Sequence, residues 1–376
     1  MSDERFMQQA LDLAGRGRGW VEPNPMVGAV IVRGGEVIGS GWHRQCGGPH
    51  AEIEALGDCQ QRGHDPAGAT MYVSLEPCTH HGRTPPCTDA LLEAKLARVV
   101  IAMVDPFERV AGEGIRRLRE AGIEVTLGIG EAQAHDLNAP FIKRQTTGLP
   151  WVILKWAQSL DGRTATRTGR SQWISNEASR RRVHEWRGRV DVIMAGIGTV
   201  LADDPQLTAR DVELRRVAHR VVVDPDLRLP EHARLVEALG NDHPPVTLAI
   251  RQALIDAHDP RILDWEARGV GIIGLPLRDA RDPGHLDLEP LMRELTQRHE
   301  ATNILVEGGA ALHGRLIEQG LADQLLAFIA PRLMGDEAAL PAVRGLVCET
   351  LDDLSELSLH HVEQLDDDVL LDYRVK

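Results

Sequence analysis

The segments "PHAEIEAL", residues 49–56, and "LEPCTHHGRTPPC", residues 75–87, follow one another closely in the chain. They contain His50, Cys78 and Cys87, and each of these cysteines directly follows a proline. Only five cysteines occur in 376 residues, so two in one short segment suggest that both bind the same metal ion. One imidazole and two thiolates suit zinc, and catalytic zinc keeps a fourth position open for water. The pattern therefore predicts a catalytic zinc site.

Glu52 adds a proton carrier to this set. With His50 it forms H-x-E, one half of the general nucleobase-deaminase signature, in which the Glu moves protons without binding the metal. The other half normally reads P-C-x-x-C, whereas here eight residues separate the two cysteines. Because zinc lowers the pKa of bound water, a hydroxide could attack an amino-bearing ring carbon while Glu52 returns a proton to the leaving ammonia. Helices expected to start at His50 and Cys87 would favour thiolate over thiol.

A structural zinc site is the alternative interpretation. Structural zinc is normally closed by a fourth protein ligand, which His80 or His81 could supply. The cysteines could also pack as small apolar residues without any metal. The H-x-E and P-C dipeptides, with a strand expected before the first cysteine and a helix after the second, favour catalysis.

The first 148 residues alternate between helical and strand patterns, which predicts a three-layer α/β domain. Helices are expected at residues 4–17, 50–61, 88–97, 113–122 and 131–148, strands at 69–75, 98–105 and 123–129, and a hairpin at 27–42 that turns at Gly34 and Gly35. Pro150 discourages continuation of the last helix, so we place a domain boundary after Gly148.

A second set of apolar runs begins after this boundary, and helical stretches separate several of them. This predicts a second α/β domain over residues 149–376. Its strands are expected within 151–159, 191–197, 219–224, 246–250, 269–275, 303–309, 323–331 and 368–375.

The composition argues against several classes of function. A formal net charge of -14 opposes the broad attraction to phosphate backbones that nucleic-acid binding uses, so any bound phosphate should be held locally. No apolar run approaches the length of a membrane span, and the acidic N-terminus has no signal-peptide pattern. Scattered cysteines in an odd number fit a reducing cytosol. We expect a cytoplasmic protein that binds neither nucleic acid nor membranes.

Together with "NPMVGAVIV", residues 24–32, the first motifs resemble the deaminase half of the bifunctional deaminase and reductase family of riboflavin biosynthesis, whose pattern has the same long cysteine spacing. The resemblance implies a cytidine-deaminase-like fold. It assigns zinc binding to His50, Cys78 and Cys87, proton transfer to Glu52, and substrate contact to Asn24, His43 and Arg83. One segment departs from the family pattern: where D-P-N-P is usual, this chain has Phe107 and Glu108 in the last two positions.

Three segments of the second domain carry glycines or polar residues after expected strands: "KWAQSLDGRTATRTGRSQWIS" at 155–175, "AGIGTVLADDPQLTAR" at 195–210 and "ILVEGGAAL" at 304–312. In the last of these, a strand, a Gly308–Gly309 turn and a helix form an arrangement that can cradle a pyrophosphate. None of the three is a complete G-x-G-x-x-G fingerprint, and each turn alone favours a structural interpretation.

Together these segments resemble the reductase half of the same family, which has a dihydrofolate-reductase-like fold and uses NADPH. The resemblance places Ala157, Trp173, Thr199, Asp203, Gly308 and Gly309 at NADPH, and Ser171, Arg187, Leu207, Arg210 and Glu307 at the phosphoribosyl substrate. Arg187 and Arg210 can pair with a phosphate through forked hydrogen bonds, although Arg187 alone would favour a solvated residue of an arginine-rich helix. Lys155 and Asp161 are candidates for supporting protonation or substrate orientation.

The resemblance therefore implies two consecutive reactions. Zinc-dependent hydrolytic deamination of 2,5-diamino-6-(5-phosphoribosylamino)pyrimidin-4(3H)-one would be followed by NADPH-dependent reduction to 5-amino-6-(5-phosphoribitylamino)uracil. The family tends to form dimers or tetramers, so a homo-oligomer is expected. Two alternatives are a zinc nucleoside or nucleic-acid deaminase with a non-catalytic C-terminal binding domain, and a zinc-stabilised scaffold without enzymatic activity.

Overall fold

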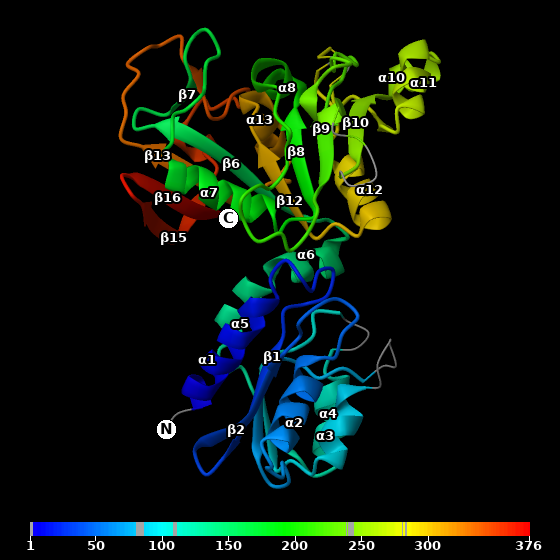
Figure 1. Ribbon diagram of the computed structural model, residues 1–376, viewed down its shortest axis with the longest axis vertical. Helices are drawn as coiled ribbons and strands as arrows, with labels where there is room; N and C mark the ends of the chain where they lie inside the picture. Colours follow the sequence, from blue (N-terminus) through cyan, green and yellow to red (C-terminus); the bar gives the residue numbers. More distant parts are fainter. Residues whose placement is uncertain are drawn as a thin grey trace. The chain divides into compact units, whose positions relative to one another are not determined.

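The computed structural model describes residues 3–79, 86–107, 111–237, 239, 244–279, 281–282 and 284–376. The chain forms two compact units, Met1–Gly148 and Leu149–Lys376. Each unit contains its own β-sheet with helices packed against it (Figure 1). None of the helices in the described ranges is long and apolar enough to cross a membrane.

The first unit is built on a five-stranded sheet with the order β2-β1-β3-β4-β5. Its strands are β1 (Gly28–Arg33), β2 (Glu36–Trp42), β3 (Thr70–Leu75), β4 (Arg98–Met103) and β5 (Glu124–Leu127). β1 pairs antiparallel with both β2 and β3, whereas β3, β4 and β5 run parallel. The carboxyl end of β3 therefore lies beside the carboxyl end of β4.

Helices cover both faces of this sheet. Their bounds are α1 (Asp3–Ala14), α2 (Ala51–Gln61), α3 (Cys87–Glu93), α4 (Glu113–Glu120), α5 (Glu131–Leu137) and α6 (Ala139–Thr147). Figure 1 shows α1 and α5 on one side of the sheet, and α2, α3 and α4 on the other. The predicted three-layer arrangement is confirmed.

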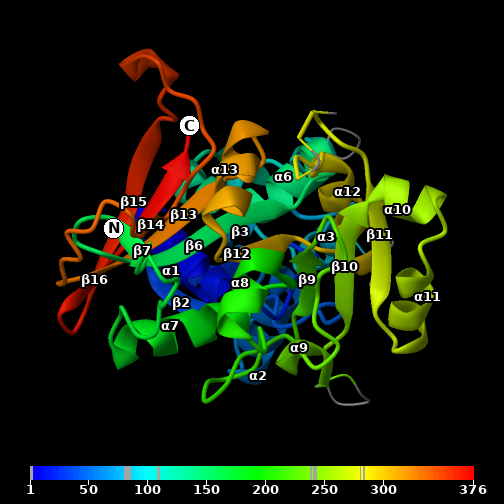
Figure 2. The same ribbon diagram turned by 90° about the horizontal axis from the view of Figure 1, so that it is seen from above.

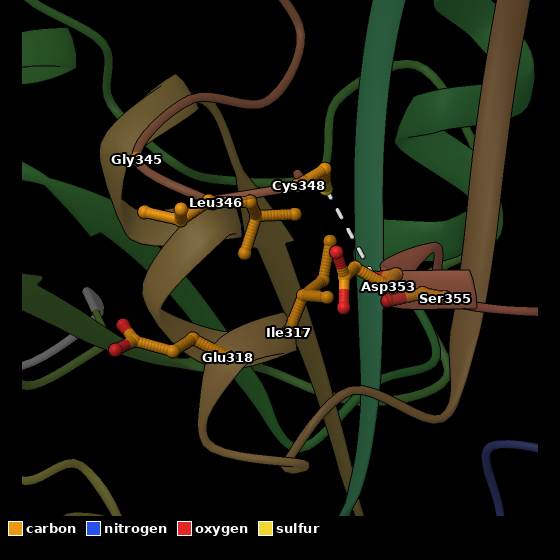
Figure 3. A pocket seen from close by; sticks show the side chains of 8 residues that line it. Ile317, Glu318, Gly345, Leu346, Cys348, Asp353 and Ser355 are labelled. Atoms are coloured by element: carbon orange, nitrogen blue, oxygen red, sulfur yellow. Dashed lines mark hydrogen bonds between the residues drawn. The ribbon is translucent and has the colours of Figure 1, made fainter. Parts of the chain in front are cut away.

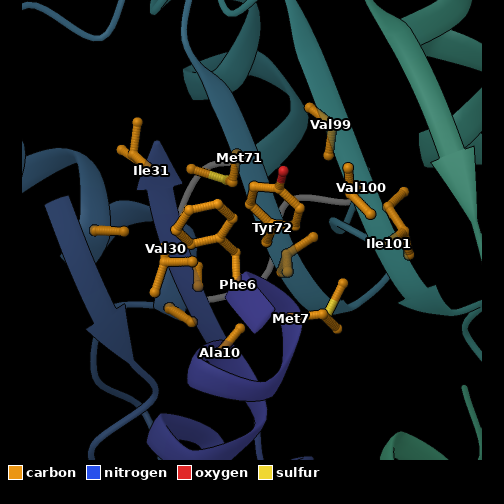
Figure 4. Close-up of a cluster of buried hydrophobic side chains, with 14 of the residues drawn as sticks. Phe6, Met7, Ala10, Val30, Ile31, Met71, Tyr72, Val99, Val100 and Ile101 are labelled. Atoms are coloured by element: carbon orange, nitrogen blue, oxygen red, sulfur yellow. The ribbon is translucent and has the colours of Figure 1, made fainter. Parts of the chain in front are cut away.

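The core of this unit forms where α1 lies on the sheet (Figure 4). Phe6, Met7 and Ala10 recur at helical spacing and are buried, so one face of α1 is apolar. They pack against buried strand residues such as Met71 and Ile101. At the start of the same helical face, the Asp3 carboxylate accepts hydrogen bonds from Tyr72 Oη at 2.6 Å and from Arg98, which ties the start of α1 to β3 and β4.

Two glycines of β2 allow α2 to approach the sheet closely. A Cβ atom on Gly41 would lie 2.5 Å from the backbone nitrogen of Ala55, and one on Gly39 would lie 2.6 Å from the Ala55 carbonyl oxygen. Both distances are too short for a real side chain, so only glycine fits at these two positions. The close approach matters because His50 and Glu52 lie at the start of α2.

The predicted closing helix over residues 131–148 is divided in two, because Asn138 separates α5 from α6. The Asn138 side chain is buried and behaves like a backbone amide: its Oδ1 accepts from the Met26 N–H at 2.8 Å, and its Nδ2 donates to the Met26 carbonyl at 3.0 Å. The helix expected at 88–97 ends earlier, at Glu93, and Lys95 has a positive φ of 51°.

The second unit contains a nine-stranded sheet with the order β11-β10-β9-β8-β12-β6-β13-β16-β15. Its strands are β6 (Trp151–Ser159), β8 (Val192–Gly196), β9 (His219–Val223), β10 (Val246–Arg251), β11 (Gly271–Leu275), β12 (Asn303–Glu307), β13 (Gln324–Ala330), β15 (Leu357–Leu365) and β16 (Asp368–Val375). The strands from β11 to β13 are parallel, and β16 and β15 add an antiparallel edge. All eight strands expected from the sequence are present.

Both faces of this sheet are buried. Ile193 and Ala195 of β8 point into one apolar cluster, and the alternating residues Val192 and Met194 point into the other. Helices α7 (Glu177–Arg187) and α11 (Pro260–Ala267) contribute to the first cluster, while α12 (Glu289–His299) and α13 (Ala310–Glu318) contribute to the second. The remaining helices are α8 (Ile197–Asp203), α9 (Arg234–Glu237) and α10 (Gln252–Asp256).

Three strands were not expected from the sequence. Two are the short strands β7 (Arg163–Ala165) and β14 (Leu340–Pro341), which pair only with each other. The third, β15, is an edge strand that lies at the opposite end of the sheet from β11 (Figure 2). Its first six residues are exposed, including Leu359 and Val362, so no inward and outward alternation marks it as a strand.

We predict that Gly41→Ala will destabilise the first unit by about 1–3 kcal/mol, because the added methyl group must push α2 away from β2. The matched control is Gly57→Ala in the middle of α2, where no atom lies within 4 Å of the added Cβ. That change should stabilise the helix by up to about 1 kcal/mol. Calorimetry of the full chain measures both shifts, and equal effects of the two changes would contradict the prediction.

Candidate functional site

The three expected zinc ligands converge in the first unit. His50 is the N-cap residue of α2, Cys87 is the first residue of α3, and Cys78 follows the end of β3. His50 Nδ1 lies 3.5 Å from Cys78 Sγ and 3.2 Å from Cys87 Sγ. All three ligand atoms lie within 4.8 Å of one another. The helix starts predicted for this segment are therefore present, and the Cys87 N–H at the start of α3 points toward the cluster.

The spacing of these atoms suits zinc. Ideal tetrahedral zinc, with Zn–S near 2.3 Å and Zn–N near 2.0 Å, requires a nitrogen to sulfur separation of about 3.5 Å. The observed separations of 3.5 and 3.2 Å are close to this value. The Cys87 N–H donates to Cys78 Sγ at 3.3 Å, which favours a thiolate at that position. His80, His81 and Arg83, three residues with expected roles, lie outside the described residues.

Glu52 lies two residues after His50, in the first turn of α2, and is buried, with 3% of its surface exposed. Burial and the nearby Cys78 raise the pKa of Glu52 to about 7. The carboxyl group therefore faces the ligand cluster rather than solvent. This placement suits a group that exchanges protons with a molecule bound beside the ligands.

Asn24 and His43 form a second group next to the ligands. Asn24 Nδ2 donates to His43 Nε2 at 3.1 Å, and His43 Nδ1 donates to the Pro49 carbonyl at 2.9 Å, which fixes the ring. The His43 ring packs edge-on against the His50 ring, with centroids 5.5 Å apart. Burial lowers the pKa of His43, so the ring is neutral at neutral pH. Asn138, through Met26, holds the segment that carries Asn24.

Glu76, which the sequence analysis did not select, is buried directly before Pro77 and Cys78. Its carboxylate accepts hydrogen bonds from the backbone N–H groups of Asp105, Gly112, Gly114 and Ile115, at 2.9–3.3 Å. These bonds reach the segment that departs from the family pattern. There Phe107 is exposed and its N–H donates to the Asp105 side chain, while Glu108 lies outside the described residues.

The centre of the second unit contains three neighbouring charges. Glu307 at the end of β12 lies opposite Lys155 of β6, with Nζ and Oε2 3.7 Å apart. Arg187 at the end of α7 donates to both oxygens of Glu307, at 2.5 and 2.8 Å. Burial alone would raise the pKa of Glu307, but the charges of Arg187 and Lys155 outweigh it and hold the pKa at about 2. Burial lowers the pKa of Lys155, and Glu307 partly opposes that shift.

This pairing changes the interpretation of Arg187. The residue is not solvated, and its guanidinium group is already engaged by Glu307 and by the Thr208 carbonyl. Arg210 is exposed, and its guanidinium group donates to the Gln206 and Thr208 side chains, while its backbone N–H donates to His184 Nδ1. No ion pair joins Arg210 to a carboxylate among the described residues. Burial and the charges of Arg187 and Arg210 lower the pKa of His184 to about 4. Arg210 is therefore the better placed of the two arginines for a phosphate.

Some of the residues expected at NADPH and at the substrate lie in two contacting sets, Thr199 with Gly308 and Ser171 with Asp203. A Cβ on Gly308 would lie 2.8 Å from the Thr199 side chain, and both Gly308 and Gly309 have positive φ angles, of 77° and 92°. The turn before α13 therefore requires glycine and packs against α8. In the second set, Ser171 Oγ donates to Asp203 Oδ1 at 2.9 Å.

The other expected residues of this unit differ in exposure. Trp173 is 61% exposed, and Arg180 stacks on its ring. Ala157 is half-buried in β6, opposite Phe328 of β13. Leu207 has a positive φ of 52° and a buried side chain, so only its backbone can face a substrate.

Asp161 does not fit a role in protonation. Its carboxylate accepts from the N–H groups of Met334 and Gly335 and from Ser159 Oγ, at 2.6–3.2 Å. These bonds hold the pKa of Asp161 far below its usual range, so it cannot act as an acid near neutral pH. The side chain instead stabilises the turn after β13.

A separate pocket lies beside the end of α13 (Figure 3). It is lined by Ile317, Glu318, Gly345, Leu346, Val347, Cys348, Asp353 and Ser355. None of these residues belongs to either predicted site, and we assign the pocket no role.

Comparisons with known proteins agree with both halves of the geometry. Residues 1–103 match the family described as the cytidine and deoxycytidylate deaminase zinc-binding region, and residues 150–371 match the RibD C-terminal domain. The riboflavin biosynthesis protein RibD of Escherichia coli (strain K12) is 42% identical over 377 residues, which cover 99% of each chain. The chain belongs to the RibD family.

Other members of the RibD family support this assignment. RibD of Aquifex aeolicus (strain VF5) is 36% identical, with 99% of this chain and 98% of the relative covered. The solved structure of Acinetobacter baumannii RibD, form 1, superposes with a TM-score of 0.82 at 37% identity and covers 100% of this chain and 99% of its own. A Thermotoga maritima deaminase/reductase structure gives a TM-score of 0.83 at 34% identity, with 99% and 98% covered.

Membership of the RibD family confirms the predicted fold class and the two activities. The chain is a bifunctional deaminase and reductase of riboflavin biosynthesis, with zinc and NADPH as its cofactors. A non-catalytic C-terminal binding domain and a non-enzymatic scaffold are both excluded by this membership.

Proposed function

We propose that residues 1–148 deaminate 2,5-diamino-6-(5-phosphoribosylamino)pyrimidin-4(3H)-one and that residues 149–376 reduce the product to 5-amino-6-(5-phosphoribitylamino)uracil. The observation that carries the proposal is the convergence of His50, Cys78 and Cys87 beside the buried Glu52. It occurs in a chain whose second half matches the RibD C-terminal domain.

In the deaminase reaction, His50, Cys78 and Cys87 would hold zinc, which lowers the pKa of a water when bound. Glu52 takes a proton from the attacking water and gives it to the departing amino group, so the ring gains a carbonyl oxygen and loses ammonia. Asn24 and His43 orient the pyrimidine, and their mutual hydrogen bond supports this role. Arg83 would contact the substrate from the segment between the two cysteines.

In the reductase reaction, Ala157, Trp173, Thr199, Asp203, Gly308 and Gly309 would face NADPH, which supplies the hydride. The phosphate would be held by Arg210, with Ser171, Leu207, Arg187 and Glu307 forming the rest of the substrate wall. Hydride addition at C1' of the opened sugar also requires one proton. Lys155 is our candidate for supplying or directing that proton, because its pKa is lowered and Glu307 fixes its position.

We further propose that the protein is a cytoplasmic homo-oligomer, a dimer or a tetramer. The exposed apolar side chains of the edge strand β15, including Leu359 and Val362, support contact with a second copy. The net charge of -14 argues against nucleic acid as a partner.

The direct test is mass spectrometry of the diaminopyrimidinone after incubation with purified, zinc-quantified protein. We expect the deaminated product without NADPH, and the ribityl product only after NADPH is added. A substrate that stays intact in the presence of stoichiometric zinc would contradict the proposed deaminase reaction and would point to the segment around Phe107.

We predict that Glu52→Gln will lower the rate of ammonia release by roughly 100-fold to 10,000-fold, because the amide cannot carry the proton. Zinc content, measured by elemental analysis, should be unchanged because Glu52 is not a ligand. The reductase rate serves as the internal control. Full deaminase activity, or loss of zinc, would refute the assigned role.

We predict that Lys155→Met will lower the turnover of NADPH oxidation by roughly 100-fold. Deamination by the same preparation should not change, since it depends on the other unit. An unchanged reductase rate would remove Lys155 from the mechanism, while a changed KM with normal kcat would assign it to substrate binding only.

A further inference from the structure

Eight residues separate the two cysteines of the zinc site, compared with two in a C-x-x-C motif. The ligand atoms nevertheless lie close together. Cys78 follows β3 and Cys87 begins α3, so the distance between the two sulfur atoms depends on how these two elements are held. Helix α4 contacts both the segment that follows β3 and helix α3.

One end of α4 is attached to the segment that carries Cys78. The N-cap of α4, Gly112, offers no side-chain cap, and the Glu76 carboxylate takes that role from a distant part of the chain. It accepts from Gly112 N, and also from Gly114 N and Ile115 N in the first turn. Contact here is close, since a Cβ on Gly114 would lie 2.3 Å from the Pro77 carbonyl oxygen.

The body of α4 is attached to the segment that carries Cys87. Arg117 Nη2 donates to Asp89 at 2.7 Å, and its Nη1 donates to Thr88 Oγ1 at 3.3 Å, both in the first turn of α3. Thr88 Oγ1 in turn donates to the Cys78 carbonyl at 3.2 Å. The buried side chains of Ile115 and Leu118 pack α4 against the core of the unit.

We propose that α4 is a brace for the zinc site, in which Glu76 and Arg117 are positioning residues that set the distance between the two thiolates. Neither residue is one of the expected zinc ligands. This inference rests on the proposed zinc site, and it adds that residues outside the ligand set determine how tightly the metal is held.

The test uses the full chain loaded with zinc and compares Arg117→Met with Arg116→Met. Arg116 is the matched control because it is adjacent in α4 and, within the part of the chain that the structure describes, pairs with Glu113 and Glu120 of the same helix. The measured quantity is the rate of zinc transfer to a chromophoric chelator. We expect Arg117→Met to release zinc roughly 10-fold to 100-fold faster than the wild type, and Arg116→Met to match the wild type.

Two further measurements separate a brace from general destabilisation. Cobalt(II) bound in place of zinc should show shifted absorption bands in Arg117→Met, because the sulfur positions change in the folded protein. Glu76→Gln places an amide NH2 group against backbone N–H donors, so it should also accelerate zinc release. Because both residues act through one helix, the increase in release rate of the Glu76→Gln, Arg117→Met double variant should be smaller than the product of the two single increases. Arg117→Lys, which retains the charge beside Asp89, should be intermediate.

The outcomes are distinct. A wild-type protein that holds no zinc would refute the zinc site itself. A wild-type protein that holds zinc, with Arg117→Met releasing it at the same rate and an unshifted cobalt spectrum, would refute the brace alone. If Glu76→Gln does not fold, the comparison of Arg117→Met, Arg117→Lys and Arg116→Met still decides.

Discussion

The placement of one imidazole nitrogen and two sulfur atoms within 4.8 Å of one another is the constraint on which the first unit depends. It requires the starts of two helices and the end of a central strand to meet at one point. Glycines at positions 39 and 41 allow α2 to lie directly on β2, which brings His50 inward. Glu76 joins the end of β3 to α4, which in turn contacts α3. Much of the local packing therefore serves the ligand geometry without contributing a ligand.

The second unit organises its site around charge instead. A buried carboxylate is costly unless it is paired, and Glu307 has two cationic neighbours, Arg187 and Lys155. The cluster therefore has a net positive charge, and Arg210 adds to it. In a chain with an overall charge of -14, such a local excess offsets the repulsion that the total charge would exert on the phosphate groups of the proposed ligands.

The sequence predicted features that are local and periodic. Runs of branched apolar residues predicted eight of the nine strands of the second sheet, and the H-x-E and P-C dipeptides predicted the ligands that converge. What it did not predict depends on partners distant in sequence. Arg187 and Glu307 are 120 positions apart, and their pairing could not be read from either segment alone. The same holds for Glu76, whose acceptor role appears only when the fold brings α4 to it. β15 was missed for a different reason: its partner β16 follows directly in the chain, but its exposed residues lack a two-residue period.

Asn138 has a consequence for how the chain can be divided. Its side chain forms hydrogen bonds with the backbone N–H and carbonyl of Met26, which lies 112 positions earlier and just beyond Asn24. Asn138 itself is only ten residues from the end of the first unit. During synthesis the segment that carries Asn24 therefore lacks these hydrogen bonds until almost the whole unit has left the ribosome. Gene fission upstream of this codon would leave the expected zinc ligands intact and the segment that carries Asn24 unsupported. An independent deaminase derived from this chain has to keep α5 and the residue that ends it.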